Sequence, residues 1–462
     1  MNLPQLNMIH NATMAILADT GVAFHSEKAV SLFKQHGFRT DGQLVFLTEQ
    51  QVQSALEHVP STFTLHARNP AKDILIGGGE PALAPGYGAP HVITANGTKR
   101  DATLADYHQF CKLGHSSDVI NVTGFLMVDP IDLPHSHYHL DMLLANILYS
   151  DQPFMGSPLS VVTARDALEM VRILFGDISR PVMISNINAL APLQYAEEMA
   201  EALMANAGHR QPLLITGGGI MGATAPMKIA GLKVVSNASI LAGIVLSQLA
   251  APGVPVVYGA VGSPMDMRSG SFYLGSAEAH LSMAVGAALA RYYNLPCRGG
   301  GGLTDAHTLD FQAGAQSGLA LLATRLNRID FVLHTCGILG AYMAMNLAKF
   351  IADEELWRTV AKMTTEVVVD EDSIDLETIR EVGVGGQYLT HPRTFDLCRT
   401  EFQPTEIMNR LSYDSWQSSG DTDIAARAYR IAQKRLESYE QPDMDPTIQK
   451  DLENFVSKRK QA

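Results

Sequence analysis

Apolar side chains recur at helical spacing along the first 60 residues. Residues 5–36 carry this pattern in two stretches, and residues 47–59 repeat it after Thr48, a residue type that caps helices. We predict that residues 1–80 form a helical N-terminal cap.

From about residue 82 the pattern changes to short apolar runs that end in Gly, Ser or Asn and alternate with amphipathic segments of helical length. The eight runs are 82–95, 119–128, 153–158, 181–189, 212–219, 254–262, 295–302 and 331–338. An eighth helix is predicted at 340–352. Alternation of this kind is typical of parallel βα units, and eight of them predict an α/β fold, a (β/α)8 TIM barrel over residues 81–352. The first strand has an alternative, because Asn96-Gly97 could instead turn a hairpin.

Beyond residue 353 the chain is charged and helical, with a Gly-rich interruption at 382–395. We predict a C-terminal helical extension, residues 353–462, packed on the barrel. A barrel of this size with such an extension is also expected to form a homo-oligomer.

Composition narrows the classes of partner. The 462 residues include 34 Lys and Arg against 47 Asp and Glu, a net charge of −13, and no basic cluster that would neutralise phosphates. Nucleic acid and anionic membranes are therefore not expected. The N-terminus has no basic segment before an apolar run, so we expect a cytoplasmic protein. Four cysteines lie far apart, which is typical of reduced thiols: Cys111, Cys297, Cys336 and Cys398.

Candidate binding chemistry lies at the ends of the last two predicted strands, because reactive groups of barrels lie at the carboxyl ends of strands. Arg298 precedes four glycines, 299–302, and His334 ends the next run. An Arg fork and a His donor on neighbouring strand ends could clamp a carboxylate. Alternatively, Arg298 pairs with a structural Asp and His334 is a core histidine. The glycines could approach a ligand or only allow tight packing.

Two further groups of residues could carry chemistry. The cluster His135, His137 and His139 alternates along one segment and could bind zinc, although loop histidines are more often solvated. Aromatic rings near strand ends could surround a quaternary ammonium, or could simply belong to the core. These are Tyr87, Tyr258, Phe272, Tyr273, Phe311 and Tyr342.

Several segments together give the chain a family resemblance. Residues 60–70, 73–79, 88–107, 299–314 and 383–421 make it resemble the trimethylamine methyltransferase superfamily over most of its length. The founding members carry pyrrolysine in the active site, whereas this sequence contains standard amino acids alone, so it resembles the branch without pyrrolysine. The resemblance implies a (β/α)8 barrel.

The resemblance also implies an activity. A methyl group would pass from a quaternary amine, with glycine betaine favoured, to the Co(I) corrinoid (cobalamin) of a separate corrinoid protein, releasing dimethylglycine. Co(I) is itself the nucleophile, so we expect positioning and electrostatics rather than a catalytic acid or base, and no cofactor tightly bound to this chain. Proline betaine, carnitine and γ-butyrobetaine are the alternative substrates.

Within that family Arg298 and His334 match the residues that hold the substrate carboxylate. From their positions alone we add four predicted substrate-binding residues: Tyr87, Glu278, Asp305 and Gln312. Two alternative functions stay open, a zinc-dependent barrel enzyme using the histidine cluster and a betaine-binding homologue without catalysis.

Overall fold

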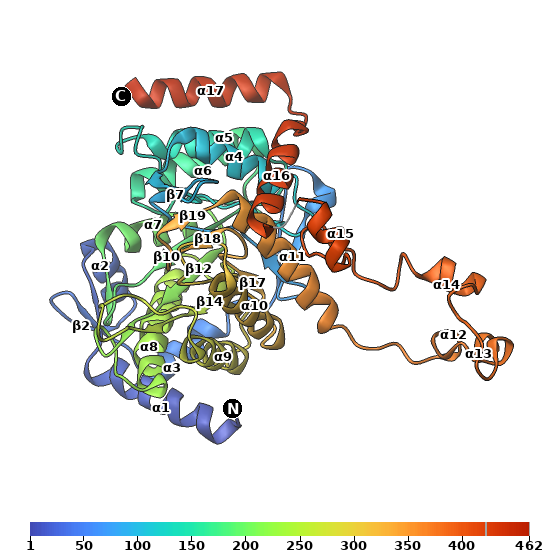
Figure 1. Ribbon diagram of the computed structural model, residues 1–462. Coiled ribbons are helices and arrows are strands. Elements are labelled where there is room, and N and C mark those ends of the chain that lie inside the picture. The colour runs from blue at the N-terminus through green and yellow to red at the C-terminus, as the bar shows by residue number, and fades with distance from the viewer. Residues whose placement is uncertain (421–422, 462) are drawn as a thin grey trace.

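The computed structural model describes residues 1–420 and 423–461. Two parallel sheets lie at the centre of the main body, with helices around them (Figure 1). The first has the order β14-β12-β10-β9, and the second the order β16-β17-β6. Their bounds are β6 Ala82–Leu83, β9 Phe154–Met155, β10 Met183–Asn188, β12 Leu213–Gly217, β14 Val256–Ala260, β16 Arg298–Gly299 and β17 Phe331–Val332. Every residue of β12 and β14 is buried, which is typical of a parallel sheet covered on both faces.

Isolated bridges join the two sheets. A parallel bridge links Tyr258 of β14 to Cys297, and another links Thr123 to Phe154 of β9. The amides of Asn121 and Val122 donate to the carbonyl of Leu83 in β6 at 3.1 and 3.2 Å. The predicted α/β fold is confirmed. Over the described residues, however, the regular strands do not close into one sheet, and the predicted run 119–128 contains no regular strand, so the closed barrel is not confirmed.

The helices that alternate with these strands follow the predicted segments. They are α4 Leu104–His115, α5 Tyr138–Tyr149, α6 Val161–Phe175, α7 Glu197–Gly208, α8 Ile229–Ala250, α9 Ala277–Tyr292, α10 Phe311–Leu326 and α11 Leu347–Met363. Side chains of Ser276 and Asp310 cap α9 and α10, which begin beside the strand ends. The eighth helix was predicted at 340–352. That prediction is wrong in its bounds, because Asn346 caps α11 and its buried face continues to Val360.

The hairpin alternative for residues 91–101 is correct. Strand β7 (His91–Ile93) pairs antiparallel with β8 (Lys99–Asp101), and Gly97 has a φ of 81° in the turn. The positive φ explains why glycine follows Asn96 there. β7 also lies beside β19 (Ala344–Met345), which pairs with β18 (Ile338–Leu339). Short strands β13 (Ile220–Met221) and β15 (Ser263–Pro264) pair above the first sheet's carboxyl ends.

The N-terminal region mixes helices and strands. Helices α1 (Leu3–Asp19) and α3 (Glu49–Leu56) pack on α8, and α2 (Glu27–Gln35) packs on α7 and α8. Beside them lies a sheet of order β11-β1-β3-β2, and residues 63–76 form a separate hairpin. The strands are β1 Val22–Phe24, β2 Arg39–Asp41, β3 Leu44–Phe46, β4 Phe63–Leu65, β5 Ile74–Ile76 and β11 Gln194–Tyr195, and Pro70–Lys72 is a short 3-10 helix, η1. The predicted purely helical cap is therefore wrong in this respect.

The C-terminal region leaves the body and returns to it. After α11 the chain extends outward through α12 (Glu371–Ile374), α13 (Leu376–Val382) and α14 (Pro392–Leu397), as Figure 1 shows. It returns at α15 (Tyr413–Ser418), and α16 (Ile424–Glu437) packs on α11 while α17 (Pro446–Gln461) packs on α5 and α6. The predicted extension, residues 353–462, is thus described except for positions 421, 422 and 462.

One helix, α8, is long and apolar enough to cross a membrane by length and composition. In this fold 72% of its apolar window is buried against other elements. Core helices of this kind pass the same test, so the helix is weak evidence for a membrane span.

Candidate functional site

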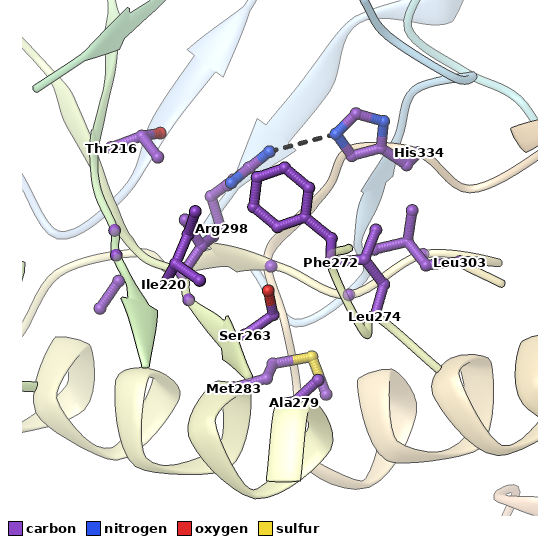
Figure 2. A pocket seen from close by; sticks show the side chains of 18 of the residues that line it. Thr216, Ile220, Ser263, Phe272, Leu274, Ala279, Met283, Arg298, Leu303 and His334 are labelled. Carbon is purple, nitrogen blue, oxygen red and sulfur yellow. Dashed lines mark hydrogen bonds between the residues drawn. The ribbon is translucent and has the colours of Figure 1, made fainter. Parts of the chain in front are cut away.

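A cavity of about 440 Å³ lies at the carboxyl ends of the parallel strands. Thr216 is the last residue but one of β12, Ala260 ends β14 and Arg298 begins β16. Ala279 and Met283 of α9 line the opposite side of the cavity from His334 in Figure 2. Because parallel strands bring their carboxyl ends to one edge, residues far apart in sequence meet here. This is the end of the fold where the sequence predicted the site.

Arg298 and His334 meet inside this cavity. Arg298 Nη2 lies 3.4 Å from His334 Nε2, across the neighbouring strands β16 and β17, as the dashed line in Figure 2 shows. His334 is 6% exposed, and the Nε atom of Arg298 is buried with no hydrogen-bond partner among the described residues. The two predicted clamp residues therefore lie side by side, with donor capacity left unused.

The backbone of Tyr87 decides which nitrogen of His334 carries the proton. The Tyr87 amide donates to Nδ1 of His334 at 3.2 Å. A neutral imidazole has one acceptor nitrogen, so Nε2 carries the hydrogen. Nε2–H and the Arg298 guanidinium are then both donors. Two donors at 3.4 Å cannot satisfy each other, and a shared acceptor is required.

Burial keeps His334 uncharged. Burial, and then the positive charge of Arg298, lower the pKa of His334 well below its usual value of 6.5. Burial also lowers the pKa of Arg298, but from a value so high that the guanidinium stays charged. The pair thus presents one positive charge and one neutral N–H. Carboxylate chemistry fits this donor set, because an anion can accept from both groups.

The charge of Arg298 has no acidic partner in the described part of the chain. Among residues 1–420 and 423–461, no Asp or Glu lines the cavity, and the groups that influence the Arg298 guanidinium include no carboxylate. An isolated buried cation is costly, and buried charges are ordinarily paired. The reading of Arg298 as the partner of a structural Asp is therefore wrong, and an external anion is the natural counter-charge.

Glycines hold the two strand ends at close range. Gly300 has a φ of 68° and Gly301 a φ of 111°, conformations that side chains rarely adopt. A Cβ on Gly301 would lie 2.4 Å from the carbonyl oxygen of His334, and one on Gly300 would lie 2.1 Å from Thr324 Oγ1. The glycine run thus allows tight packing, which brings the backbone that follows β16 against the backbone of His334.

A buried ion pair supports the same two strand ends from behind. Lys349 Nζ lies 2.5 Å from Asp353 Oδ1 within α11, and both side chains are almost fully buried. Lys349 also donates to the carbonyl of Gly302 at 3.0 Å, and Asp353 accepts from the amide of Gly337 at 2.8 Å. The pair therefore links the chain after Arg298 to the chain after His334.

The rest of the cavity wall is neutral and largely apolar. Phe272 lies in front of Arg298 and His334 in Figure 2, with Leu274 and Leu303 beside it. Tyr342 also lines the cavity, and its ring centroid lies 4.7 Å from that of His334. Aromatic and apolar surfaces suit the methyl groups of a quaternary ammonium, whose diffuse charge is attracted to ring faces.

The other four predicted site residues do not line the cavity. Asp305 accepts from the amides of Leu274 and Gly275 at 2.8 and 2.9 Å, so it anchors the loop that carries Phe272. Tyr87 contributes its amide to His334 and is not among the residues that line the cavity. Glu278 and Gln312 are exposed and do not line the cavity, because they lie on the outer faces of α9 and α10.

The remaining aromatic candidates are also outside the cavity. Tyr258 is fully buried and donates to Asn237 Oδ1 at 2.9 Å, which is a core role. Tyr273 and Phe311 are exposed. Of the six aromatic rings predicted, the structure places Phe272 and Tyr342 in the cavity wall.

Sequence reasoning missed several residues of the wall. Thr216, Ser263 and Met283 line the cavity, and none belongs to a motif. His280 also lines it, and its Nε2 is buried without a partner among the described residues. Gln316, which does not line the cavity, was missed as a supporting residue. It accepts from Thr304 and from the amide of Asp305, one helical turn beyond the predicted Gln312. An amide facing inward at helical spacing was the available signal.

The histidine cluster does not converge. His139 Nε2 lies 3.0 Å from Asp166 Oδ2 in the core, while His135 packs on the ring of Tyr138. His137 lies at the start of α5, and its Nδ1 has no partner among the described residues. Across residues 1–420 and 423–461, no three His, Cys, Asp or Glu side chains are grouped so that they could hold a metal ion. The zinc hypothesis is therefore not supported by these residues.

Comparisons with known proteins show the family of this chain. The family model described as trimethylamine methyltransferase (MTTB) matches residues 1–462. This chain belongs to the trimethylamine methyltransferase family. The glycine betaine methyltransferase of Desulfitobacterium hafniense (strain Y51) is 40% identical over 459 residues, which cover 98% of this chain and 96% of that protein. The proline betaine:corrinoid methyltransferase of Eubacterium limosum is 32% identical over 97% of this chain and 95% of its own length.

A solved structure supports the fold of this family member. The crystal structure of a hydroxylamine complex of MtmB aligns with a TM-score of 0.53 at 11% sequence identity, covering 95% of this chain and 88% of that one. At this identity the likeness concerns the fold alone. The alignment shows that the α/β fold is shared over nearly the whole length of this chain.

Proposed function

We propose that this protein transfers a methyl group from a quaternary amine that bears a carboxylate, with glycine betaine the best fit, to the Co(I) corrinoid of a separate corrinoid protein. The observation that carries the proposal is the pair of buried donors, Arg298 and His334, in a cavity whose described lining contains no acid. Relatives named for glycine betaine and proline betaine support it.

The carboxylate of the substrate is bound by the clamp. One oxygen accepts from Nε2–H of His334 and the other from the Arg298 guanidinium, which satisfies both unused donors. Charge-assisted hydrogen bonds of this kind are worth about 1.5–3 kcal/mol each. A simple methylamine has no carboxylate and would leave the buried cation unpaired, so it is a poor substrate.

The cationic end of the substrate lies against the neutral wall. The rings of Phe272 and Tyr342 offer their faces to the ammonium, and the apolar side chains around them exclude water. The N–CH3 bond breaks with its electron pair remaining on nitrogen, so the leaving group is the neutral amine of dimethylglycine and no proton is required. Cobalt supplies the electron pair of the new bond to carbon. The chain's own contribution is orientation and desolvation.

Tyr87 and Asp305 support the site by positioning His334 and Phe272. The Tyr87 amide holds His334 in the tautomer that points N–H into the cavity, and Asp305 holds the loop of Phe272. We assign the corrinoid to the partner protein, and no tight corrinoid site to this chain.

The proposal also covers the architecture of the protein, its cellular location and its oligomeric state. The two parallel sheets and their connecting bridges support a (β/α)8 barrel over residues 81–352, with residues 1–80 and 353–462 as additions. We place the enzyme in the cytoplasm and expect it to act as a homo-oligomer without nucleic acid or membrane partners.

Methylation of cob(I)alamin tests the function directly. Purified protein is incubated with cob(I)alamin and glycine betaine, proline betaine, carnitine, γ-butyrobetaine or trimethylamine in parallel, and the absorbance change on methylation is followed. We expect methylation with one betaine and none with trimethylamine. Methylation with trimethylamine alone contradicts the clamp, and betaine binding without methyl transfer establishes the non-catalytic alternative.

A further inference from the structure

Helix α8 carries one charged side chain, Lys233, in an otherwise uncharged and mostly apolar sequence. The lysine is fully buried. Its Nζ atom donates to the carbonyl oxygen of Ala260 at 2.7 Å and lies 3.4 Å from that of Val261. Burying a charged amine is costly unless an acid pairs with it. Methionine would fill the same space at a lower cost, so packing alone does not explain a lysine here.

Lys233 lies directly behind the wall of the cavity. Ala260 and Val261, whose carbonyls it contacts, both line the cavity at the end of β14. A Cβ on Gly286 of α9 would lie 2.6 Å from the same Ala260 oxygen, so this carbonyl is held between α8 and α9. Lys233 is not among the residues that line the cavity. Any effect of its charge on a bound molecule therefore passes through this wall.

The charge of Lys233 has no acidic partner among residues 1–420 and 423–461. Burial alone lowers the pKa of Lys233, to about 7, and no carboxylate raises it again. Lys349 is the contrast, because it also donates to a strand-end carbonyl, that of Gly302 at 3.0 Å, but has Asp353 at 2.5 Å. The charge of Lys349 is thus neutralised within the chain, whereas that of Lys233 is left to act on the cavity.

Titratable groups on the elements packed around α8 do not balance this charge. They are His10 and Asp19 of α1, Glu27, Lys28 and Lys34 of α2, Glu49 of α3, Tyr195 of β11, Glu197, Glu198 and Glu201 of α7, Tyr258 of β14, and Glu278, His280, Arg291, Tyr292 and Tyr293 of α9 and its end. None of them contributes to the shift of the Lys233 pKa. The amine therefore changes its charge near neutral pH, positive below about 7 and neutral above.

This charge matters when the proposed substrate is bound. The carboxylate of the substrate matches Arg298, which leaves the substrate ammonium and Lys233 as two positive charges without a counter-charge in the described cavity lining. Like charges repel more strongly in a protein interior than in water. When the methyl group leaves, its bonding electron pair stays on nitrogen and the nitrogen becomes neutral. The repulsion therefore raises the energy of the substrate complex and is relieved as the methyl group is transferred.

We propose that Lys233 is a positioning residue of this site, which holds the end of β14 and places behind it a positive charge that favours loss of positive charge from the substrate nitrogen. The inference rests on the proposed function, because it concerns the same cavity and the same quaternary ammonium. The clamp and the aromatic wall bind the substrate, whereas Lys233 opposes its cationic form. Lys233 therefore weakens binding of the cation and speeds its conversion to the neutral amine.

Binding of two ligands of the same shape tests the charge without methyl transfer. Glycine betaine and 3,3-dimethylbutanoate both carry a carboxylate and three methyl groups, but the first has a cationic nitrogen where the second has a neutral carbon. Both dissociation constants are measured by calorimetry at about pH 6.5, where most of Lys233 is protonated. In Lys233→Met, the preference for glycine betaine over the neutral isostere should rise on the order of tenfold. An unchanged preference overturns the proposal.

A matched control and the wild type complete this experiment. Lys228→Met is the control, because Lys228 is exposed at the N-cap of the same helix, and it should keep the wild-type preference. In wild type the preference for glycine betaine should rise as pH increases through about 7, because Lys233 loses its proton. This measurement needs no substitution. A preference that is constant over that range of pH in the wild type overturns the proposal.

Kinetics separate this role from a purely structural one. In the cob(I)alamin assay, Lys233→Met should lower kcat about tenfold and leave the KM for glycine betaine unchanged or lower, because the lost charge opposed the bound cation. The wild-type kcat should fall as pH rises through about 7, and the variant should lose this dependence. A raised KM with unchanged kcat overturns the proposal. A shifted binding preference in a wild type that methylates no cob(I)alamin refutes the proposed function instead.

Discussion

The cavity and the segment of residues 364–412 that projects after α11, here called the arm, depart from ordinary burial in opposite directions. In the cavity, Arg298 and His334 are buried polar groups whose donors have no acceptor among the described residues. In the arm, Val384 and Leu389 are apolar side chains left in solvent. A buried unpaired cation calls for a small anion, and an exposed apolar surface calls for another apolar surface. The cavity therefore lacks an anion, and the arm lacks an apolar neighbour.

The largest expected effect on stability comes from breaking the buried ion pair of Lys349 and Asp353. Unlike Arg298, each member of this pair has its counter-charge within the chain. Lys349→Met leaves the carboxylate of Asp353 buried without its cation. We expect the free energy of unfolding to fall by about 3–5 kcal/mol, measured by chemical denaturation. Lys349→Met/Asp353→Asn removes the stranded charge and keeps an acceptor for Gly337, so it should lose less. A double variant less stable than the single one contradicts this account.

The clamp is tested by removing its charge. Arg298→Ala should raise the apparent KM for glycine betaine by an amount equivalent to about 2–3 kcal/mol, measured in the cob(I)alamin methylation assay. Arg298→Lys keeps the charge but loses the planar fork, so a partial loss is expected. Arg291→Ala on the exposed side of α9 is the matched control. Unchanged kinetics in Arg298→Ala would refute the assignment of the clamp.

His334 makes the stability of the folded protein depend on pH. Its pKa is lowered by burial and by Arg298, so the folded protein binds fewer protons than the unfolded chain below about pH 6.5. Stability is therefore lost as pH falls from 6.5 towards the folded pKa, by up to ~1.4 kcal/mol per pH unit for one proton. His334→Asn lacks this contribution, and Asn tolerates the positive φ of 67° at this position. Urea unfolding at several pH values should show a shallower slope for the variant; parallel slopes exclude the mechanism.

The smallest effect is expected in the arm. Val384→Ser should change the free energy of unfolding by no more than about 0.5 kcal/mol, measured by chemical denaturation, because the side chain is fully exposed. A loss of several kcal/mol in the protomer would mean that Val384 packs within its own chain.

Much of the fold and part of the site were predictable from sequence. Strong helical periodicity placed α4 and α9 at their observed positions, since Thr103 and Ser276 cap them at the first turn. The neighbouring strand ends of Arg298 and His334 followed from the alternation of the pattern. Glu278 and Gln312 were placed wrongly because adjacent helical positions differ by about a quarter turn, which decides between cavity and solvent.

The sequence by itself determined the alternation of strands and helices and the family, because apolar periodicity is a local property of the chain and the family match covers its whole length. It also placed Arg298 and His334 on neighbouring strand ends. Only the tertiary structure decided that the Tyr87 amide sets the tautomer of His334, that the cavity lining holds no acid in the described chain, and that the arm projects from the body. These are contacts between residues as far apart as 87 and 334. Packing in three dimensions, rather than spacing along the chain, selects which distant groups meet.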